Sequence, residues 1–124
     1  MFNKELLELL MFLGINPDKK GFIYLELVTM QMYDNPSLTL KDAYEKIALS
    51  KKVSTGTIDS SIRNVIHYAF DSGKLSRLNL KMGMDVLDDK ICPTNKAFIS
   101  FLMRCFNIGN HQISFKEIDP SGNF

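Results

Sequence analysis

The segment from residue 38 to residue 70 constrains the fold of this chain most strongly, because two helical apolar repeats flank a short break there. In each repeat, apolar residues recur three and four positions apart, which places them on one face of a helix. The break is Val53-Ser54-Thr55-Gly56, in which Ser54 or Thr55 can cap a new helix. The predicted inward residues are Leu40, Ala43, Tyr44, Ile47 and Ala48 before the break, and Ile58, Ile62, Val65, Ile66 and Ala69 after it. This spacing predicts a helix-turn-helix.

The second of these helices is expected to have two chemically different faces. Opposite its apolar stripe lie Thr57, Ser60, Arg63, Asn64 and His67. One apolar side and one side of short hydrogen-bonding residues suit a helix that reads the DNA major groove. Two amphipathic helices of an ordinary α-helical bundle would give similar spacing, so the periodicity alone leaves both interpretations open.

Length and composition indicate one domain that has its own hydrophobic core. The chain has 124 residues, of which 45% are hydrophobic. No run of 18 apolar residues occurs, and Glu5 and Glu8 interrupt the apolar start, which therefore predicts an amphipathic helix rather than a signal peptide. We expect a cytoplasmic protein with no membrane partner. Cys92 and Cys105 lack metal-site spacing and are expected to be reduced thiols.

The net charge of +1 is low for a domain that binds nucleic acid, but the charge is unevenly distributed. Residues 1–40 carry three Lys or Arg and five Asp or Glu, a net −2. Residues 41–82 carry eight against four, a net +4, and residues 83–124 carry four against five, a net −1. The positive charge is therefore concentrated on and just after the predicted helix-turn-helix.

The rest of the chain predicts four more helices, which makes an all-α domain of about six helices over residues 1–107. They cover about residues 3–13, 20–33 and 75–80, with a last helix that starts at Pro93-Thr94-Asn95. The first is expected to end at Gly14, the short one at Gly83, and residues 84–91 to be irregular. Residues 108–124 have little periodicity and predict a C-terminal tail. The predicted inward residues are Leu6, Leu7, Leu10 and Leu13, then Ile23, Tyr24, Leu27, Val28 and Met30, then Phe98, Ile99, Leu102, Met103 and Phe106.

The sequence contains no convincing catalytic or metal-binding pattern. His67 and His111 are the only histidines, and the acidic cluster around Asp88 lacks the spacing of a calcium-binding loop. A Cys105–His111 nucleophile pair is conceivable, but Cys105 lies in a helix that should pack on the core. We therefore expect no enzymatic activity, no metal and no cofactor.

Four segments together carry a resemblance to a known family. They are Lys20–Leu25 (KGFIYL), Ile58–Arg63 (IDSSIR), Ala69-Phe70 with Gly73, and Pro93–Ile99 (PTNKAFI). Over about residues 5–106 the chain resembles the C-terminal effector domain of the stage-zero sporulation master regulator of endospore-forming bacteria. The combination of Pro-Thr-Asn with the upstream Gly-aromatic-Ile-Tyr-Leu is the most specific part of this resemblance.

The resemblance implies a six-helix fold whose fourth helix enters the DNA major groove. It also implies regulation of transcription from short repeated boxes, with a second copy on a tandem site. Family members read bases with an arginine, a glutamate and a second arginine, and these positions hold Thr57, Asp59 and Ser60 here. The lysine that precedes Pro-Thr-Asn in the family is Cys92, whereas Arg63 is retained. The DNA sequence that the family recognises should therefore not carry over.

The predicted contacts with double-stranded DNA fall into two groups. Bases are expected to face Thr57, Asp59, Ser60 and Asn64, and phosphates to be bound by Lys51, Lys52, Ser54, Thr55, Arg63, Lys74 and Lys81. The alternative is a protein-interaction module that keeps the fold and binds a regulatory protein partner. The near-neutral charge and the two replaced arginines motivate that alternative.

In the family the effector domain follows a phosphorylatable receiver domain. Here Met1 comes immediately before the first predicted helix. The chain is then either a fragment of a longer protein or a free-standing effector-like protein without a receiver. The Met-Phe-Asn start and the extra C-terminal segment favour the free-standing form.

Overall fold

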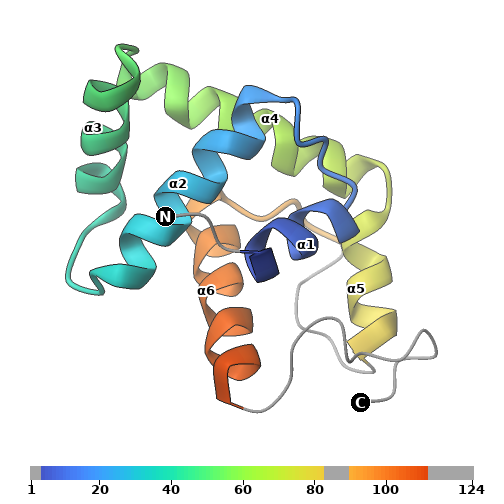
Figure 1. The fold of residues 1–124 in the computed structure, drawn as a ribbon. Helices are drawn as coiled ribbons and strands as arrows, with labels where there is room; N and C mark the ends of the chain where they lie inside the picture. The colour runs from blue at the N-terminus through green and yellow to red at the C-terminus, as the bar shows by residue number, and fades with distance from the viewer. Residues whose placement is uncertain (1–3, 83–89, 112–124) are drawn as a thin grey trace.

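The structure is a computed structural model that describes residues 4–82 and 90–111. These residues form six α-helices and no strand, which confirms the predicted all-α architecture (Figure 1). The helices are α1 (Lys4–Phe12), α2 (Lys20–Asp34), α3 (Leu40–Lys51), α4 (Thr55–Asp71), α5 (Lys74–Met82) and α6 (Asn95–His111). Helix α4 runs across the molecule, with α3 at its N-terminal end and α5 following its C-terminal end. Among the described residues, none of the helices is long and apolar enough to cross a membrane.

The predicted helix-turn-helix is formed by α3, a three-residue turn and α4. Thr39 caps α3 by accepting a hydrogen bond from the backbone N–H of Asp42. Ser54, rather than Thr55, caps α4, because its hydroxyl oxygen accepts from the backbone N–H of Thr57 at 3.0 Å. Between the helices Lys52 adopts the left-handed conformation with φ of 60°, and it is the only described residue other than glycine with positive φ. That conformation turns the chain sharply enough for α4 to start.

Helices α2 and α4 cross at very close range, and Gly21 makes this possible. A Cβ atom placed on Gly21 would lie 2.2 Å from the carbonyl oxygen of Ser61 and 2.7 Å from a methyl group of Val65. No side chain fits at that distance, so the α2 backbone at this position rests directly on α4. The glycine of the Lys20–Leu25 segment is therefore needed for the packing of two helices.

The core confirms most of the predicted inward residues. Both apolar stripes of the helix-turn-helix are buried, except that Leu40 is half-buried against the core. Leu6, Leu10 and Leu13 are buried in or just after α1, as are Phe98, Ile99 and Leu102 in α6. The side chain of Phe106 lies outside the described set.

The prediction for α2 was partly wrong. Ile23, expected in the core, is 40% exposed, and Leu27 is only half-buried. The reason is that α1, α3, α4 and α6 all pack on α2, so that burial spreads around most of the helix instead of following one stripe. Phe22 and Leu25 are buried although they lie off the expected stripe, as is Leu9 in α1. Leu7 and Met103, expected inward, are half-buried against the core.

Thr94 and Asn95 of the Pro-Thr-Asn sequence have separate structural roles at the start of α6. Thr94 caps the helix by accepting a hydrogen bond from the backbone N–H of Ala97 at 3.1 Å. Asn95, the first helical residue, is 8% exposed and directs its amide toward α3 and α4. The helix continues to His111, beyond the expected start of the tail at residue 108. Gly83 and the predicted irregular segment up to residue 89 lie outside the described residues, as does the tail from residue 112.

Candidate nucleic-acid interface

The solvent-facing side of α4 is a ridge of short, mostly uncharged side chains. Thr57, Ser60, Asn64 and His67 are all exposed, and none is covered by another element. The ridge lies opposite the buried stripe that contains Ile62 and Ile66. A helix with this exposed side can enter a groove of a nucleic acid without moving any part of the core.

Along one side of the ridge, α4 faces the start of α6 across a groove of about 410 Å³. Arg63 and His67 line this groove from α4, and Lys96 lines it from α6. All three side chains are exposed. Two permanent cations therefore border the ridge on its α6 side.

Along the other side of the ridge lies a second groove of about 600 Å³, between α4 and the start of α2. Asn64 and Tyr68 line it from α4, and the exposed Lys19 and Lys20 line it from the start of α2. Lys74 of α5 reaches the same region, because its aliphatic carbons would lie about 3 Å from a Cβ on Gly14, which also lines the groove. The ridge is thus bordered by cations on both sides.

Lys51 and Lys52 extend this basic border to the N-terminal end of α4. Both are exposed at the end of α3 and the start of the turn. Thr55, the first residue of α4, is exposed beside them. The backbone N–H groups at the start of a helix carry a partial positive charge, which adds to the attraction for an anion at this end.

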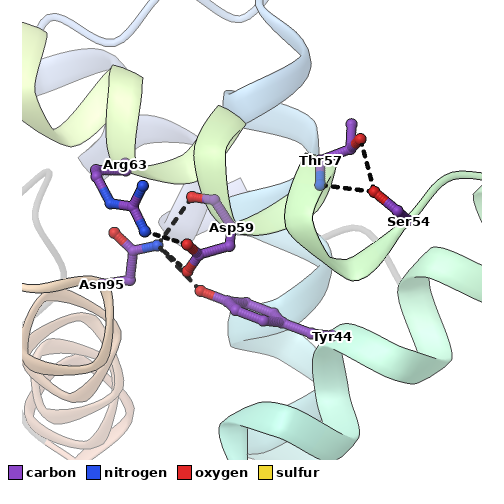
Figure 2. Close-up of polar contacts among 6 residues, drawn as sticks. All are labelled: Tyr44, Ser54, Thr57, Asp59, Arg63 and Asn95. Carbon is purple, nitrogen blue, oxygen red and sulfur yellow. Dashed lines mark hydrogen bonds and ion pairs between the residues drawn. The ribbon is translucent and has the colours of Figure 1, made fainter.

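A polar cluster holds α4 to α6 and α3 on the α6 side, as Figure 2 shows. The Asn95 amide nitrogen donates to the Tyr44 hydroxyl at 3.1 Å, to the Asp59 carbonyl oxygen at 3.0 Å and to Asp59 Oδ1 at 3.0 Å. The other carboxylate oxygen of Asp59 pairs with the Arg63 guanidinium, one helical turn further along α4. Burial raises the pKa of Tyr44, the nearby Asp59 carboxylate acts in the same direction, and the hydrogen bond from Asn95 opposes both.

The structure leaves most of the predicted contact residues exposed, at the end of α3, in the turn and along α4. Those that are exposed around the ridge are Lys51, Lys52, Ser54, Thr55, Thr57, Ser60, Arg63 and Asn64. Lys74 is half-buried but adjoins the α2-side groove, and the side chain of Lys81 lies outside the described set. Asp59 differs from the expectation, because both of its carboxylate oxygens are engaged within the protein.

Three cations beside the ridge were missed from the sequence. Lys19 and Lys20 belong to the acidic N-terminal third of the chain, and Lys96 lies more than 30 positions after Arg63. Their approach to α4 depends on how α2 and α6 pack, which periodicity does not show. A weak signal for Lys20 was its place beside Gly21, in a segment that carried the family resemblance.

The two cysteines are not joined in a disulfide, and the side chain of His111, the conceivable partner of Cys105, lies outside the described set. Cys92 and Cys105 are both free, and burial raises the pKa of Cys105 to about 12, so its thiol stays protonated near neutral pH. Burial also raises the pKa of Cys92, to which the charge of Asp71 contributes. Within the described part of the chain, no three His, Cys, Asp or Glu side chains converge as metal ligands would. The predicted acidic loop around Asp88 lies outside the described residues.

The comparison with known families places the chain in one family. The model of the family described as "Sporulation initiation factor Spo0A C terminal" matches residues 6–106, which is most of the chain. No solved structure matches the chain. The family consists of regulatory effector domains rather than enzymes. With six helices in the described residues and a family match from α1 into α6, the chain belongs to the Spo0A C-terminal family of sporulation regulator domains.

Proposed function

We propose that this protein is a sequence-specific regulator of transcription that binds double-stranded DNA with α4 in the major groove. One observation carries the proposal: the uncharged ridge of α4 is bordered on both sides by cations, from the start of α2 on one side and from Arg63 and Lys96 on the other. The major groove has the same arrangement, with base edges along its floor and phosphates along both walls.

The ridge residues determine what this helix can read. Asn64 can form paired hydrogen bonds with the N6 and N7 atoms of adenine, whereas Thr57 and Ser60 can each form single bonds with several bases. Neither hydroxyl replaces the bidentate bond of arginine to guanine. We therefore infer a preference for an A·T pair near Asn64 and a target that differs from the box of the arginine-bearing family members.

The cations on the two sides should fix the helix in the groove. Each lysine or arginine that neutralises a phosphate releases a counterion, which makes binding depend on salt. The low overall charge of the chain is compatible with this function, because the cations are gathered around α4. A second copy bound to an adjacent box is part of the proposal, as the tandem boxes of the family imply.

The experiment starts with selection of bound duplexes from a random DNA pool, followed by affinity measurements at several salt concentrations. Three double variants each remove two cations: K19Q with K20Q, K51Q with K52Q, and R63Q with K96Q. Each pair that contacts phosphates should lower the magnitude of the salt slope by about two units and weaken binding to all duplexes alike. The matched control is R104Q, because Arg104 is exposed on α6 away from both grooves.

A wild-type protein that enriches no sequence and shows no salt-dependent binding would overturn the proposal. The protein-interaction alternative would then take its place. Equal slopes for the wild type and all three double variants would show that DNA binds elsewhere on the molecule.

A further inference from the structure

The buried amide nitrogen of Asn95 binds both helices of the helix-turn-helix. Its amide group has two hydrogens and serves three acceptors within 3.1 Å, two of them on Asp59 of α4 and one on Tyr44 of α3. Only 8% of Asn95 and 8% of Tyr44 is exposed, so water does not compete strongly for these bonds. One side chain at the start of α6 thereby joins both helices of the helix-turn-helix.

The same contacts decide what Asp59 can do. Oδ1 accepts from Asn95 and Oδ2 pairs with Arg63, and the Asp59 side chain is 34% exposed. A carboxylate that reads cytosine must accept from the exposed amino group of that base. Asp59 is turned toward α6 instead, and its second oxygen holds the Arg63 guanidinium at the border of the ridge.

We propose that Asn95 is a positioning residue for DNA recognition, and that Asp59 transmits its effect instead of reading a base. Asn95 fixes the rotation of α4 through the Asp59 carbonyl and carboxylate, and Asp59 in turn fixes Arg63. This inference rests on the proposed function, since it explains how that surface keeps its geometry.

The chemistry of the site requires asparagine. An aspartate at position 95 would place a second carboxylate beside Asp59 and could not donate a hydrogen bond. Alanine would leave Oδ1 of Asp59 without its donor. The hydroxyl of Thr94, the preceding residue, bonds to the backbone N–H of Ala97 and not to Asp59, and Thr94 therefore offers a control in the same motif.

The binding experiment compares N95A, D59A, the N95A/D59A double variant and T94A. The quantity measured is the specificity ratio, the affinity for the selected duplex divided by that for a random duplex, because a change in charge affects both affinities. N95A and D59A should each lower this ratio on the order of tenfold, with the loss spread over several base pairs. The double variant should lower the ratio by less than the product of the two single losses, because both single variants remove the bond between Asn95 and the Asp59 carboxylate. T94A should lower thermal stability and leave the ratio unchanged.

A second measurement needs no DNA. In the free protein, D59A should shift the side-chain amide resonances of Asn95 in 15N–1H NMR spectra, and T94A should not. If D59A leaves those resonances unshifted, the inferred contact between Asn95 and Asp59 does not exist, whatever the DNA results.

If D59A alters preference at a single base pair while N95A alters none, Asp59 is a base reader and the inference is wrong. A wild type that binds no duplex while D59A still shifts the resonances would defeat the proposed function and with it the positioning role.

Discussion

At the scale of single residues, the proposed DNA-reading surface combines weak hydrogen-bonding groups with positive charges beside them. Thr57, Ser60 and Asn64 can discriminate bases, but none of them adds to the electrostatic attraction. The cations beside them supply attraction without discrimination. Affinity and specificity should therefore be separable by substitution.

Asn64→Ala should relax the preference at one base pair, expected to be A·T, by about 1–3 kcal/mol and leave the salt slope almost unchanged. The gain-of-function counterpart is Thr57→Arg with Ser60→Arg, which should raise affinity and move preference toward guanine. Competition between duplexes of defined sequence measures both effects. Failure of the arginine variant to gain affinity on any duplex would show that these positions do not meet bases.

Lys52 has an unfavourable backbone conformation, which it adopts in the turn between α3 and α4. Its φ of 60° is unfavourable for a residue with a Cβ atom, by about 1–2 kcal/mol. Lys52→Gly should therefore stabilise the protein by up to about 1 kcal/mol in urea unfolding and lower the magnitude of the salt slope by about one unit. Lys51→Gly, at a helical position, is the control and should destabilise the protein. A variant K52G that is less stable than the wild type would contradict this account of the turn.

The polar ridge could be predicted residue by residue, but the role of Asp59 could not. Helical spacing correctly placed Thr57, Ser60, Arg63 and Asn64 on the exposed side of α4. The Asp59 carboxylate faces α6 because it accepts a hydrogen bond from Asn95, which is 36 positions later in the chain. Local spacing contains no information about such a contact.

At the scale of elements, α4 is held from two sides by two of the four segments that carried the family resemblance, Lys20–Leu25 and Pro93–Ile99. Gly21 lets α2 approach the backbone of α4 at Ser61, and Asn95 binds α4 at Asp59. Helical periodicity predicted the six helices and the capped turn, although α6 continues beyond residue 107 to His111. It misplaced Ile23, because a central helix packed by four others has no single buried stripe.

Gly21→Ala should destabilise the domain strongly, since the new Cβ would lie 2.2 Å from the Ser61 carbonyl oxygen. The cost should be about 3 kcal/mol or more, at the upper end of overpacking effects, because neither backbone can move away easily. Gly56→Ala is the matched control: its Cβ would meet nothing closer than 3.7 Å, and alanine favours helix. Urea unfolding should rank G56A at or above the wild type and G21A far below. Equal stability of the two variants would refute the close crossing of α2 and α4.

At the scale of the whole molecule, folding changes the distribution of charge. Lys19 and Lys20 belong to the segment with a net charge of −2, yet they border the ridge together with Asn64. A count along the chain therefore underestimates the positive charge around α4. The tertiary packing of α2 and α6, rather than composition, creates the two-sided basic border.

Alkaline pH should destabilise the fold through Cys105. Burial raises the pKa of this thiol from 9.0 to about 12. Because the folded-state pKa is the higher one, this contribution to stability is intact below pH 9 and is lost as the pH rises toward 12. At a pH of about 10.5 the loss should reach about 1–2 kcal/mol. Cys105→Ala lacks this group, so the difference in unfolding free energy between wild type and variant should shrink over that range; a constant difference would contradict the burial of the thiol.

NMR titration of the wild-type protein with its selected duplex tests the central claim most directly. The account predicts that backbone amide shifts concentrate at Thr57, Ser60 and Asn64 on the ridge and at Lys19, Lys20 and Lys96 beside it. The Arg104 region of α6 should remain unchanged. Shifts confined to other helices, or a ridge that is unaffected while the duplex binds, would contradict the placement of α4 in the major groove.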